Sequence, residues 1–199
     1  MKGMALPKMS TVKAKPTFKS AAVDSDCPNL LKKQFNPSAP NRVWVSDITY
    51  IKVNGKFVYL CVIIDLFARK LIAYKTGINA KVSLVIDTFN AAYKSRRSPV
   101  GTLFHSDRGV QYTAKDFRKL LDNVNFIQSF SAKGHPFDNA VVESFFKFLK
   151  HEETDRRSFS SLDELNLALF EYAHFYNSLR PHSANGFLTP IELENEFIH

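Results

Sequence analysis

Hydrophobic and polar positions in the first half of the chain predict three β-strands. Residues 43–51 are rich in β-branched and aromatic side chains, as in a half-buried strand, and residues 57–64 are apolar at almost every position. A third run follows at residues 71–74. Asn54 and Gly55, between the first two runs, favour a two-residue hairpin turn because both tolerate positive φ. We therefore predict an antiparallel meander whose second strand is the middle one and is covered on both faces.

From residue 81 onward, helical spacing and strand-like runs alternate. Helix, strand, helix and strand are predicted in turn at residues 81–95, 100–105, 113–123 and 126–130. Further helices are predicted at residues 138–150 and 161–179, with a short last one beginning at Pro190. This order is that of an α/β, ribonuclease-H-like fold: a mixed five-stranded sheet flanked by helices, in which the first and fourth strands are neighbours.

Three side chains are expected to cap these helices at their N-termini. Thr113 and Asp138 precede the second and third helices, and Ser161 opens a capping box with Glu164.

The N-terminal segment differs in composition from the rest of the chain. Residues 1–40 lack a periodic apolar pattern and hold seven lysines against two aspartates, a net charge of 7 − 2 = +5. We therefore predict a basic flexible arm or linker at residues 1–40 and one domain at residues 41–199. Contact with DNA phosphates and simple solvation explain the composition of the arm equally well.

Charge and cysteine content narrow the class of protein. The formal net charge of +8 favours a polyanionic partner, most simply nucleic acid. Cys27 and Cys61 lie in unlike contexts, so a disulfide framework is not expected, which suits a reducing cytosol. The sequence has no histidine and cysteine spacing typical of zinc, no signal-peptide pattern at its start, and no apolar run of membrane-spanning length. We expect a cytoplasmic protein.

Two acids on the predicted sheet are candidates for chemistry. Asp47 lies within an otherwise β-forming run, where a charge costs several kcal/mol unless it is compensated. Asp107 follows the fourth strand, with Gly109 allowing a sharp turn. Because the two strands are predicted neighbours, the carboxylates should approach and repel each other, and a divalent cation would remove that conflict. Mg²⁺ prefers such oxygen ligands, together with water and substrate phosphates.

The helix at residues 138–150 has a polar line on the side opposite its apolar stripe. Asn139, Glu143, Lys147 and Lys150 are spaced by four, four and three residues and so share one face. The pattern alone suits an ordinary surface helix with a Glu143–Lys147 ion pair as well as a helix that carries a metal ligand.

Other titratable side chains have simpler interpretations. Asp65 is expected to stabilise a turn or to pair with Arg69, and Asp138 to act as a helix cap. His105 is either a packed strand histidine or a neighbour of the site.

Three segments and one spacing indicate a family. Residues 41–51, 105–113 and 138–146 resemble the signature blocks of bacterial insertion-sequence transposases of the OrfB type, which have a retroviral-integrase-like core. The 35 residues between Asp107 and Glu143 match that family's D,D(35)E pattern, and Lys150 matches its basic residue seven positions later. Residues 175–183 resemble its C-terminal signature.

The resemblance implies a catalytic activity and its residues. Asp47, Asp107 and Glu143 would bind Mg²⁺ or Mn²⁺, as two ions, for DNA cleavage and strand transfer during transposition. Expected DNA contacts are Arg108, Lys133, Asn139, Lys147 and Lys150. Since the loop before the third helix is flexible and contains Gly134, we expect Glu143 to be displaced until metal and DNA arrive.

The resemblance also implies partners and leaves alternatives. We expect a homo-multimer on DNA. Since only a lysine-rich arm precedes the core, recognition of the element ends is expected from a separate helix-turn-helix subunit. A catalytically silent, truncated DNA-binding remnant and a ribonuclease-H-like nuclease without strand joining are the alternatives.

Overall fold

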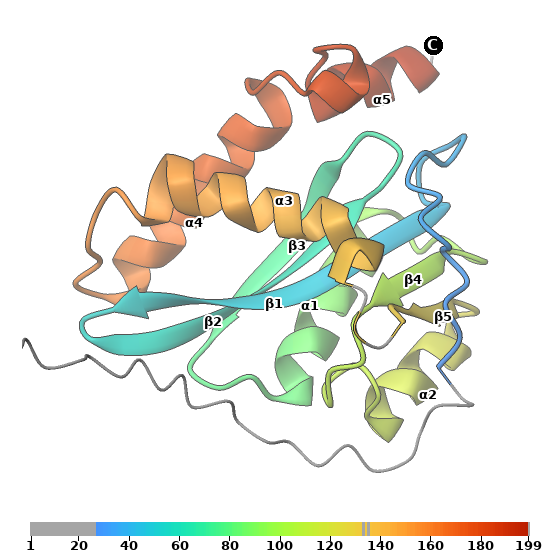
Figure 1. The fold of residues 1–199 in the computed structure, drawn as a ribbon, viewed down its shortest axis with the longest axis horizontal. Coiled ribbons are helices and arrows are strands. Elements are labelled where there is room, and N and C mark those ends of the chain that lie inside the picture. Colours follow the sequence, from blue (N-terminus) through green and yellow to red (C-terminus); the bar gives the residue numbers. More distant parts are fainter. Residues whose placement is uncertain (1–26, 133, 135, 199) are drawn as a thin grey trace, which may run out of the picture.

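A computed structural model describes residues 27–132, 134 and 136–198. One five-stranded sheet has the order β3-β2-β1-β4-β5 (Figure 1). Its strands are β1 (Val43–Val53), β2 (Lys56–Asp65), β3 (Lys70–Gly77), β4 (Leu103–Ser106) and β5 (Ile127–Phe130). The first three form the predicted antiparallel meander with β2 in its middle, and β4 and β5 run parallel to β1. The mixed sheet of a ribonuclease-H-like fold is thereby confirmed.

Helices cover both faces of this sheet (Figure 1). One face carries α1 (Val82–Ser95) and α2 (Lys115–Asn123); the other carries α3 (Ala140–Leu149) and α4 (Leu162–Ser178), with α5 (Pro190–Ile198) beyond them. A 3₁₀ turn, η1 (Pro136–Asn139), precedes α3, and a π-helical turn, η2 (Lys150–Thr154), continues it. A further 3₁₀ turn, η3 (Ser183–Asn185), precedes α5. In the described part of the chain, no helix is long and apolar enough to cross a membrane.

Two hydrophobic cores result, one on each side of the sheet. Strand β2 contributes to both, because Val62 and Ile64 point toward α3 and α4 whereas Cys61 and Ile63 point toward α1 and α2. The second core is aromatic, with the Trp44 and Phe126 rings 5.1 Å apart and the Phe89 and Phe126 rings 5.0 Å apart. This double burial explains why the β2 segment is apolar throughout.

The sheet divides where β1 and β4 part. Their parallel pairing covers only Val43 to Val45 on β1, with Val45 opposite His105. Continued by two residues, this register sets Asp47 opposite Asp107. Across the described residues, the remainder of β1 pairs with β2 along its length and otherwise forms only a single bridge at Val53, so its other edge is left open beside the two acids.

The predicted boundary of the domain is too late in the chain. Residues 27–40 were expected to belong to the flexible arm, but they pack against the domain, with Cys27 and Leu31 each only 2% exposed. The backbone N–H groups of Leu30 and Leu31 donate to Oγ of Ser129 at 2.9 and 3.2 Å. Isolated apolar residues in a polar segment have no periodicity, and this is why the pattern missed them. Residues 1–26 of the predicted arm lie outside the described part.

Of the three predicted caps, only Ser161 is confirmed, since its Oγ accepts the N–H of Glu164 at 3.1 Å. The other two predictions are wrong, because α2 and α3 begin after Ala114 and Asn139, without side-chain caps. Asp138 instead accepts the N–H of Ala132 at 3.0 Å. A contact with Asn29, 109 residues away, also draws it from the helix end.

Candidate active site

Asp47 and Asp107 lie side by side where the sheet divides. Oδ1 of Asp47 accepts the N–H of Ile48 at 2.7 Å, and Oδ1 of Asp107 accepts the N–H of Gly109 at 3.0 Å. A Cβ atom at Gly109 would lie 2.9 Å from Oδ1 of Asp107, which is too close for a real contact. A side chain at position 109 would therefore displace the carboxylate of Asp107 from this position.

The electrostatics of this pair are unfavourable without a cation. Burial, and next to it the charge of Asp107, raises the pKa of Asp47 to about 7. The pKa of Asp107 is also raised by burial of its carboxyl group, although the residue as a whole keeps a solvent-exposed surface. Within the described residues, neither carboxylate forms an ion pair with lysine or arginine. Two adjacent oxygen donors that repel each other fit a divalent cation.

Glu143 lies on the facing helix but does not complete a cluster. It is exposed in the first turn of α3, and its charge makes the smallest contribution to the raised pKa of Asp47. Among residues 27–132, 134 and 136–198, no three His, Cys, Asp or Glu side chains are close enough to share one ion. The structure therefore brings two of the expected ligands together, and the displacement of Glu143 before metal and DNA bind stays a prediction.

The residues expected to contact DNA divide into two groups. Lys147 is exposed one turn beyond Glu143, and the ammonium group of Lys150 lies 5.3 Å from the centre of the Tyr50 ring. Lys133 lies outside the described residues.

Asn139 and Arg108, in contrast, are turned toward the protein. Nδ2 of Asn139 donates to the carbonyl of Ser46 at 3.1 Å, and Asn139 is only 4% exposed because α3 begins against β1 there. The Arg108 guanidinium donates to the carbonyls of Ser131 at 3.0 Å and Cys27 at 3.3 Å. In this structure, neither side chain presents the open polar surface that the sequence suggested.

His105 is a packed strand histidine. Its ring nitrogens lie 2.8 Å from Oγ of Ser129 and 3.2 Å from Oγ of Ser131, and the residue is fully buried. Burial lowers its pKa to about 4, so the ring is neutral at neutral pH. This decides between the two interpretations left open by the sequence.

Tyr112 supports the site, and it was not among the residues predicted from the sequence. Its buried hydroxyl lies 2.8 Å from Oγ of Ser46, the residue before Asp47, and Ser46 in turn donates to the carbonyl of Val62 at 2.8 Å. This contact fixes the strand that carries Asp47. It joins residues 66 positions apart, so no local pattern signals it.

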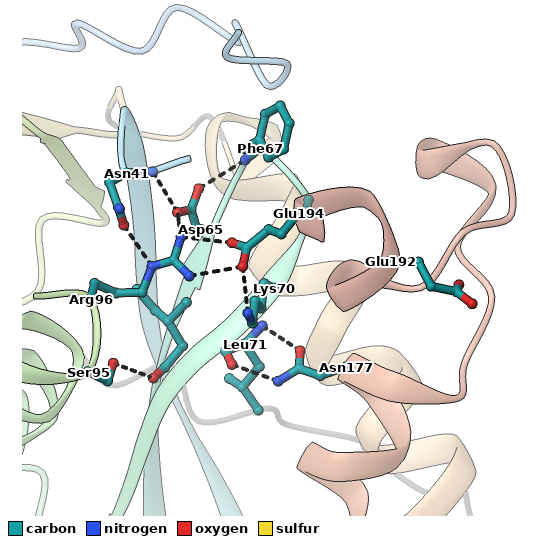
Figure 2. A network of polar contacts seen from close by, with 12 residues as sticks. Asn41, Asp65, Phe67, Lys70, Leu71, Ser95, Arg96, Asn177, Glu192 and Glu194 are labelled. Atoms are coloured by element: carbon teal, nitrogen blue, oxygen red, sulfur yellow. Dashed lines mark hydrogen bonds and ion pairs between the residues drawn. The ribbon is translucent and has the colours of Figure 1, made fainter. Parts of the chain in front are cut away.

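Asp65 belongs to a separate, structural network (Figure 2). It is fully buried and accepts the N–H groups of Asn41 at 2.7 Å and Phe67 at 3.0 Å. Burial raises its pKa, while these donors and Arg96, at 3.1 Å, act in the opposite direction. The structural role is confirmed, but Arg69 is the wrong partner, because its guanidinium donates to the carbonyls of Phe35 and Leu66.

Glu194 completes this second group of charges (Figure 2). Nη1 and Nη2 of Arg96 lie 3.0 and 2.7 Å from its carboxylate oxygens, and Lys70 forms an ion pair with it. Burial acts to raise the pKa of Glu194, but hydrogen bonds from Arg96 and Lys70 outweigh it and hold the pKa below its ordinary value. We refer to Asp65, Lys70, Arg96 and Glu194 as the balanced cluster, and to Asp47 and Asp107, which Glu143 faces from α3, as the acidic cluster.

Comparison with known proteins agrees with this geometry. Residues 37–136 and 126–190 each match a family described as "Integrase core domain". The chain is 37% identical over 171 residues to the insertion element IS600 uncharacterized 31 kDa protein of Shigella sonnei, covering 85% of this chain and 63% of that protein. It is 36% identical to the transposase for insertion sequence element IS904 of Lactococcus lactis, covering 84% and 66%. The chain thus spans less than two thirds of the length of these relatives.

Solved structures share the fold. The integrase catalytic core domain of HTLV-2, in complex with magnesium, superposes with a TM-score of 0.65 at 16% identity, over 80% of this chain and 99% of that one. The catalytic domain of the Mos1 mariner transposase gives a TM-score of 0.57 at 21% identity, over 66% and 69%. The arrangement of strands and helices around Asp47 and Asp107 is therefore that of an integrase and transposase catalytic core.

Proposed function

The chain belongs to the integrase core domain family, and on that premise we propose that it is the catalytic core of a DNA transposase. It cleaves a phosphodiester at the end of a mobile element and joins the freed 3′-hydroxyl to target DNA. The observation that carries this proposal is the uncompensated Asp47–Asp107 pair at the point where the sheet divides. Named transposases among the relatives support the same activity.

The acidic cluster would hold Mg²⁺ or Mn²⁺, as two ions. When bound, the ions activate the attacking oxygen and stabilise the leaving oxygen of an in-line phosphoryl displacement. Asp47 supplies its carboxylate from within β1 and Asp107 from just after β4, and each is fixed by a backbone N–H group. Glu143 would join them when a rearrangement of the start of α3 in the presence of DNA brings its carboxylate to the pair.

Other residues position the DNA without reading its sequence. Lys147 and Lys150 follow Glu143 on the same helix, where their ammonium groups would bind backbone phosphates. Lys133 would act likewise from the preceding loop. Asn139 and Arg108 would contact DNA only after giving up their present hydrogen bonds to backbone carbonyls. We include this change in the same proposed rearrangement of α3 and the loop before it.

Assembly follows from the reaction, because two element ends must be joined to one target. We propose a homo-multimer on DNA acting in the bacterial cytosol, with end recognition supplied by a separate helix-turn-helix subunit. An intasome and a trimeric integrase core are among the structures with the same fold, which supports assembly.

Nicking of supercoiled plasmid and joining of an end-labelled duplex, each with Mg²⁺, Mn²⁺ or EDTA, test the proposal. Wild type should act only with metal, and Asp107→Asn and Glu143→Gln should be inactive. Asp116→Asn, an exposed acid on α2, is the matched control and should behave as wild type. Equal activity in all variants would overturn the proposal. DNA binding without metal-dependent cleavage would indicate a silent remnant, and cleavage without joined products would indicate a nuclease.

A further inference from the structure

A cleft of about 720 Å³ lies beyond the acidic cluster, between the tip of the β1–β2 hairpin and the chain that follows α3. We call it the hairpin cleft. Its principal lining residues are Tyr50, Lys52, Phe57, Lys150, Arg157 and Phe159.

The cleft exists because the sheet divides. Past Val45, β1 has no β4 neighbour, so one edge of the strand stays open until Val53 forms a single bridge with Phe159. The N–H of Asn54 donates to the carbonyl of Phe159 at 2.8 Å and closes the far end. Figure 1 shows the segment between α3 and α4 descending to the tip of the hairpin. The open edge of β1 therefore forms one side of the hairpin cleft, and the η2 turn forms the other.

The lining combines exposed aromatic rings with cations. Tyr50 and Phe57 are 56% and 57% exposed, and their rings meet edge to face with centroids 4.9 Å apart. Lys150 lies over the Tyr50 ring, and Lys52 is exposed beside it. More than half of each ring is still exposed after these contacts, so the pair presents flat apolar faces that suit a ligand of the same kind.

The charge of the cleft favours an anion. Lys52, Lys150 and Arg157 line it against one acid, Asp155. Arg157 is also paired with Glu153, but its guanidinium still lies 5.4 Å from the Phe159 ring. Aromatic faces interleaved with cations are the usual lining of sites for unpaired nucleic acid, in which bases stack and phosphates meet the cations.

Two elements connect the cleft with the acidic cluster. Tyr50 is three residues beyond Asp47 on β1, and Lys150 is seven residues beyond Glu143 along α3 and its π-helical extension. Because side chains alternate along a strand, Tyr50 points to the opposite face of the sheet from Asp47. A DNA strand whose phosphate lies at the acids would therefore reach the aromatic pair across the open edge of β1.

We propose that the hairpin cleft binds unpaired DNA next to the cleaved phosphodiester. One or two unstacked bases lie against Tyr50 and Phe57, and the adjoining phosphate meets Lys52 and Lys150. A duplex keeps the faces of its bases stacked inside the helix, and a volume of about 720 Å³ is that of a site for a small ligand. This inference rests on the proposed function, because it assumes that DNA reaches the acids.

Fluorescence of oligothymidylate with one central 2-aminopurine tests the stacking, and anisotropy of labelled single-stranded and blunt duplex DNA tests the preference. Both are measured with Ca²⁺ so that no cleavage interferes. Wild type should quench 2-aminopurine on binding. The double variant Tyr50→Ala/Phe57→Ala should lose the quenching and lower the ratio of single-strand to duplex affinity by about tenfold, since each stacked base is worth about 1–3 kcal/mol.

Controls separate this inference from folding and from the proposed function. Phe170→Ala removes a comparably exposed ring from α4, 66% exposed, and should leave both readouts as in wild type. Tyr50→Phe should keep the quenching, because it retains the ring.

The opposite results are equally definite. No quenching by wild type, or an unchanged affinity ratio in the double variant, would overturn the inference. It would also be overturned if the open edge of β1 bound extended peptides and the cleft bound no DNA. None of these outcomes affects the Asp107→Asn cleavage test, on which the proposed function is judged separately.

Discussion

The acidic cluster and the balanced cluster are built on neighbouring strands of one sheet, with Asp47 on β1 and Asp65 on β2, but only the balanced cluster contains cations. Asp65 and Glu194 share Arg96, and Lys70 adds a second positive charge (Figure 2). Asp47 and Asp107 have only backbone N–H partners among the described contacts. Burial of an acid therefore does not by itself mark a functional site. What marks it is burial that the protein leaves electrically unbalanced.

The two clusters also have opposite effects on the stability of the fold. The balanced cluster connects the end of α1 to β2, β3 and α5, elements distant in the chain, and so holds the layers together. The acidic cluster lies where β1 and β4 separate, and its like charges act against folding. A bound cation would relieve this instability, and in the proposed function it would couple the stability of the domain to its activity.

The largest expected effect is on catalysis, in Asp107→Asn. Loss of one carboxylate should lower metal-dependent cleavage by at least about a thousandfold, since a metal contributes several kcal/mol and 1.4 kcal/mol is tenfold. Circular dichroism and thermal unfolding should show a fold at least as stable as wild type, because the variant removes one of two charges that repel each other. If the variant still cleaved DNA at a tenth of the wild-type rate, Asp107 would not be a metal-binding catalytic residue.

The next largest effect is on stability, in Arg96→Ala. Asp65 and Glu194 would be left buried without their shared cation, and breaking a buried pair costs about 3–5 kcal/mol. Urea unfolding at neutral pH measures the loss of unfolding free energy, with Arg97→Ala as the neighbouring control. A loss below about 1 kcal/mol, the range of surface pairs, would show that the balanced cluster is not structural.

A change of opposite sign is expected for Asp47→Asn without metal. The pKa of Asp47 is raised to about 7 in the fold, from an ordinary value of 3.8. The wild-type domain therefore loses stability as the pH rises from about 4 to about 7, because the folded state holds a proton that the unfolded state releases. The variant cannot ionise, so at pH 8 it should be more stable by about 2 kcal/mol, half of the full shift because Asp47 is partly exposed.

Urea unfolding at pH 4 and pH 8, with and without 10 mM Mg²⁺, checks this prediction. The advantage of Asp47→Asn should vanish at pH 4 and shrink with Mg²⁺ at pH 8. A variant less stable than wild type at pH 8 would contradict the charge imbalance assigned to the acidic cluster.

The smallest effect is expected for Lys70→Met in the balanced cluster. Glu194 keeps both hydrogen bonds from Arg96, and Lys70 itself is partly exposed, so the loss should be about 1 kcal/mol. Combining it with Arg96→Ala in a double-mutant cycle measures the coupling. Additive losses would mean that the two cations act independently on Glu194.

The sequence predicted the sheet and its acids because both depend on local patterns. Alternation at residues 43–51 and an apolar run at residues 57–64 are enough for the meander, and strand adjacency then relates Asp47 to Asp107. The metal-binding roles of Asp47, Asp107 and Glu143 stay predictions. The helix that carries Glu143 was found, but among the described residues no three-ligand cluster was.

What the sequence did not predict depends on contacts between distant residues. Arg96 meets Glu194 across 98 positions, and Asn29 meets Asp138 across 109. Such pairs follow from how layers pack, so proximity in sequence wrongly suggested Arg69 for Asp65. The burial of Leu31 was missed for the same reason, since its partner Ser129 comes 98 residues later.

Calorimetric titration of Mn²⁺ into the metal-free domain at pH 8 tests the central claim most directly, because it measures binding by the acidic cluster apart from DNA. Wild type should bind Mn²⁺, and Asp47→Asn should weaken binding by at least about tenfold. The loss of a direct metal ligand should lower the affinity more than the loss of a residue that only orients a ligand, which itself costs about tenfold or more. Glu194→Gln, which keeps an acceptor oxygen in the balanced cluster, should bind Mn²⁺ as wild type does. Equal affinity in wild type and Asp47→Asn, or equal loss in both variants, would contradict the assignment of the metal to Asp47 and Asp107.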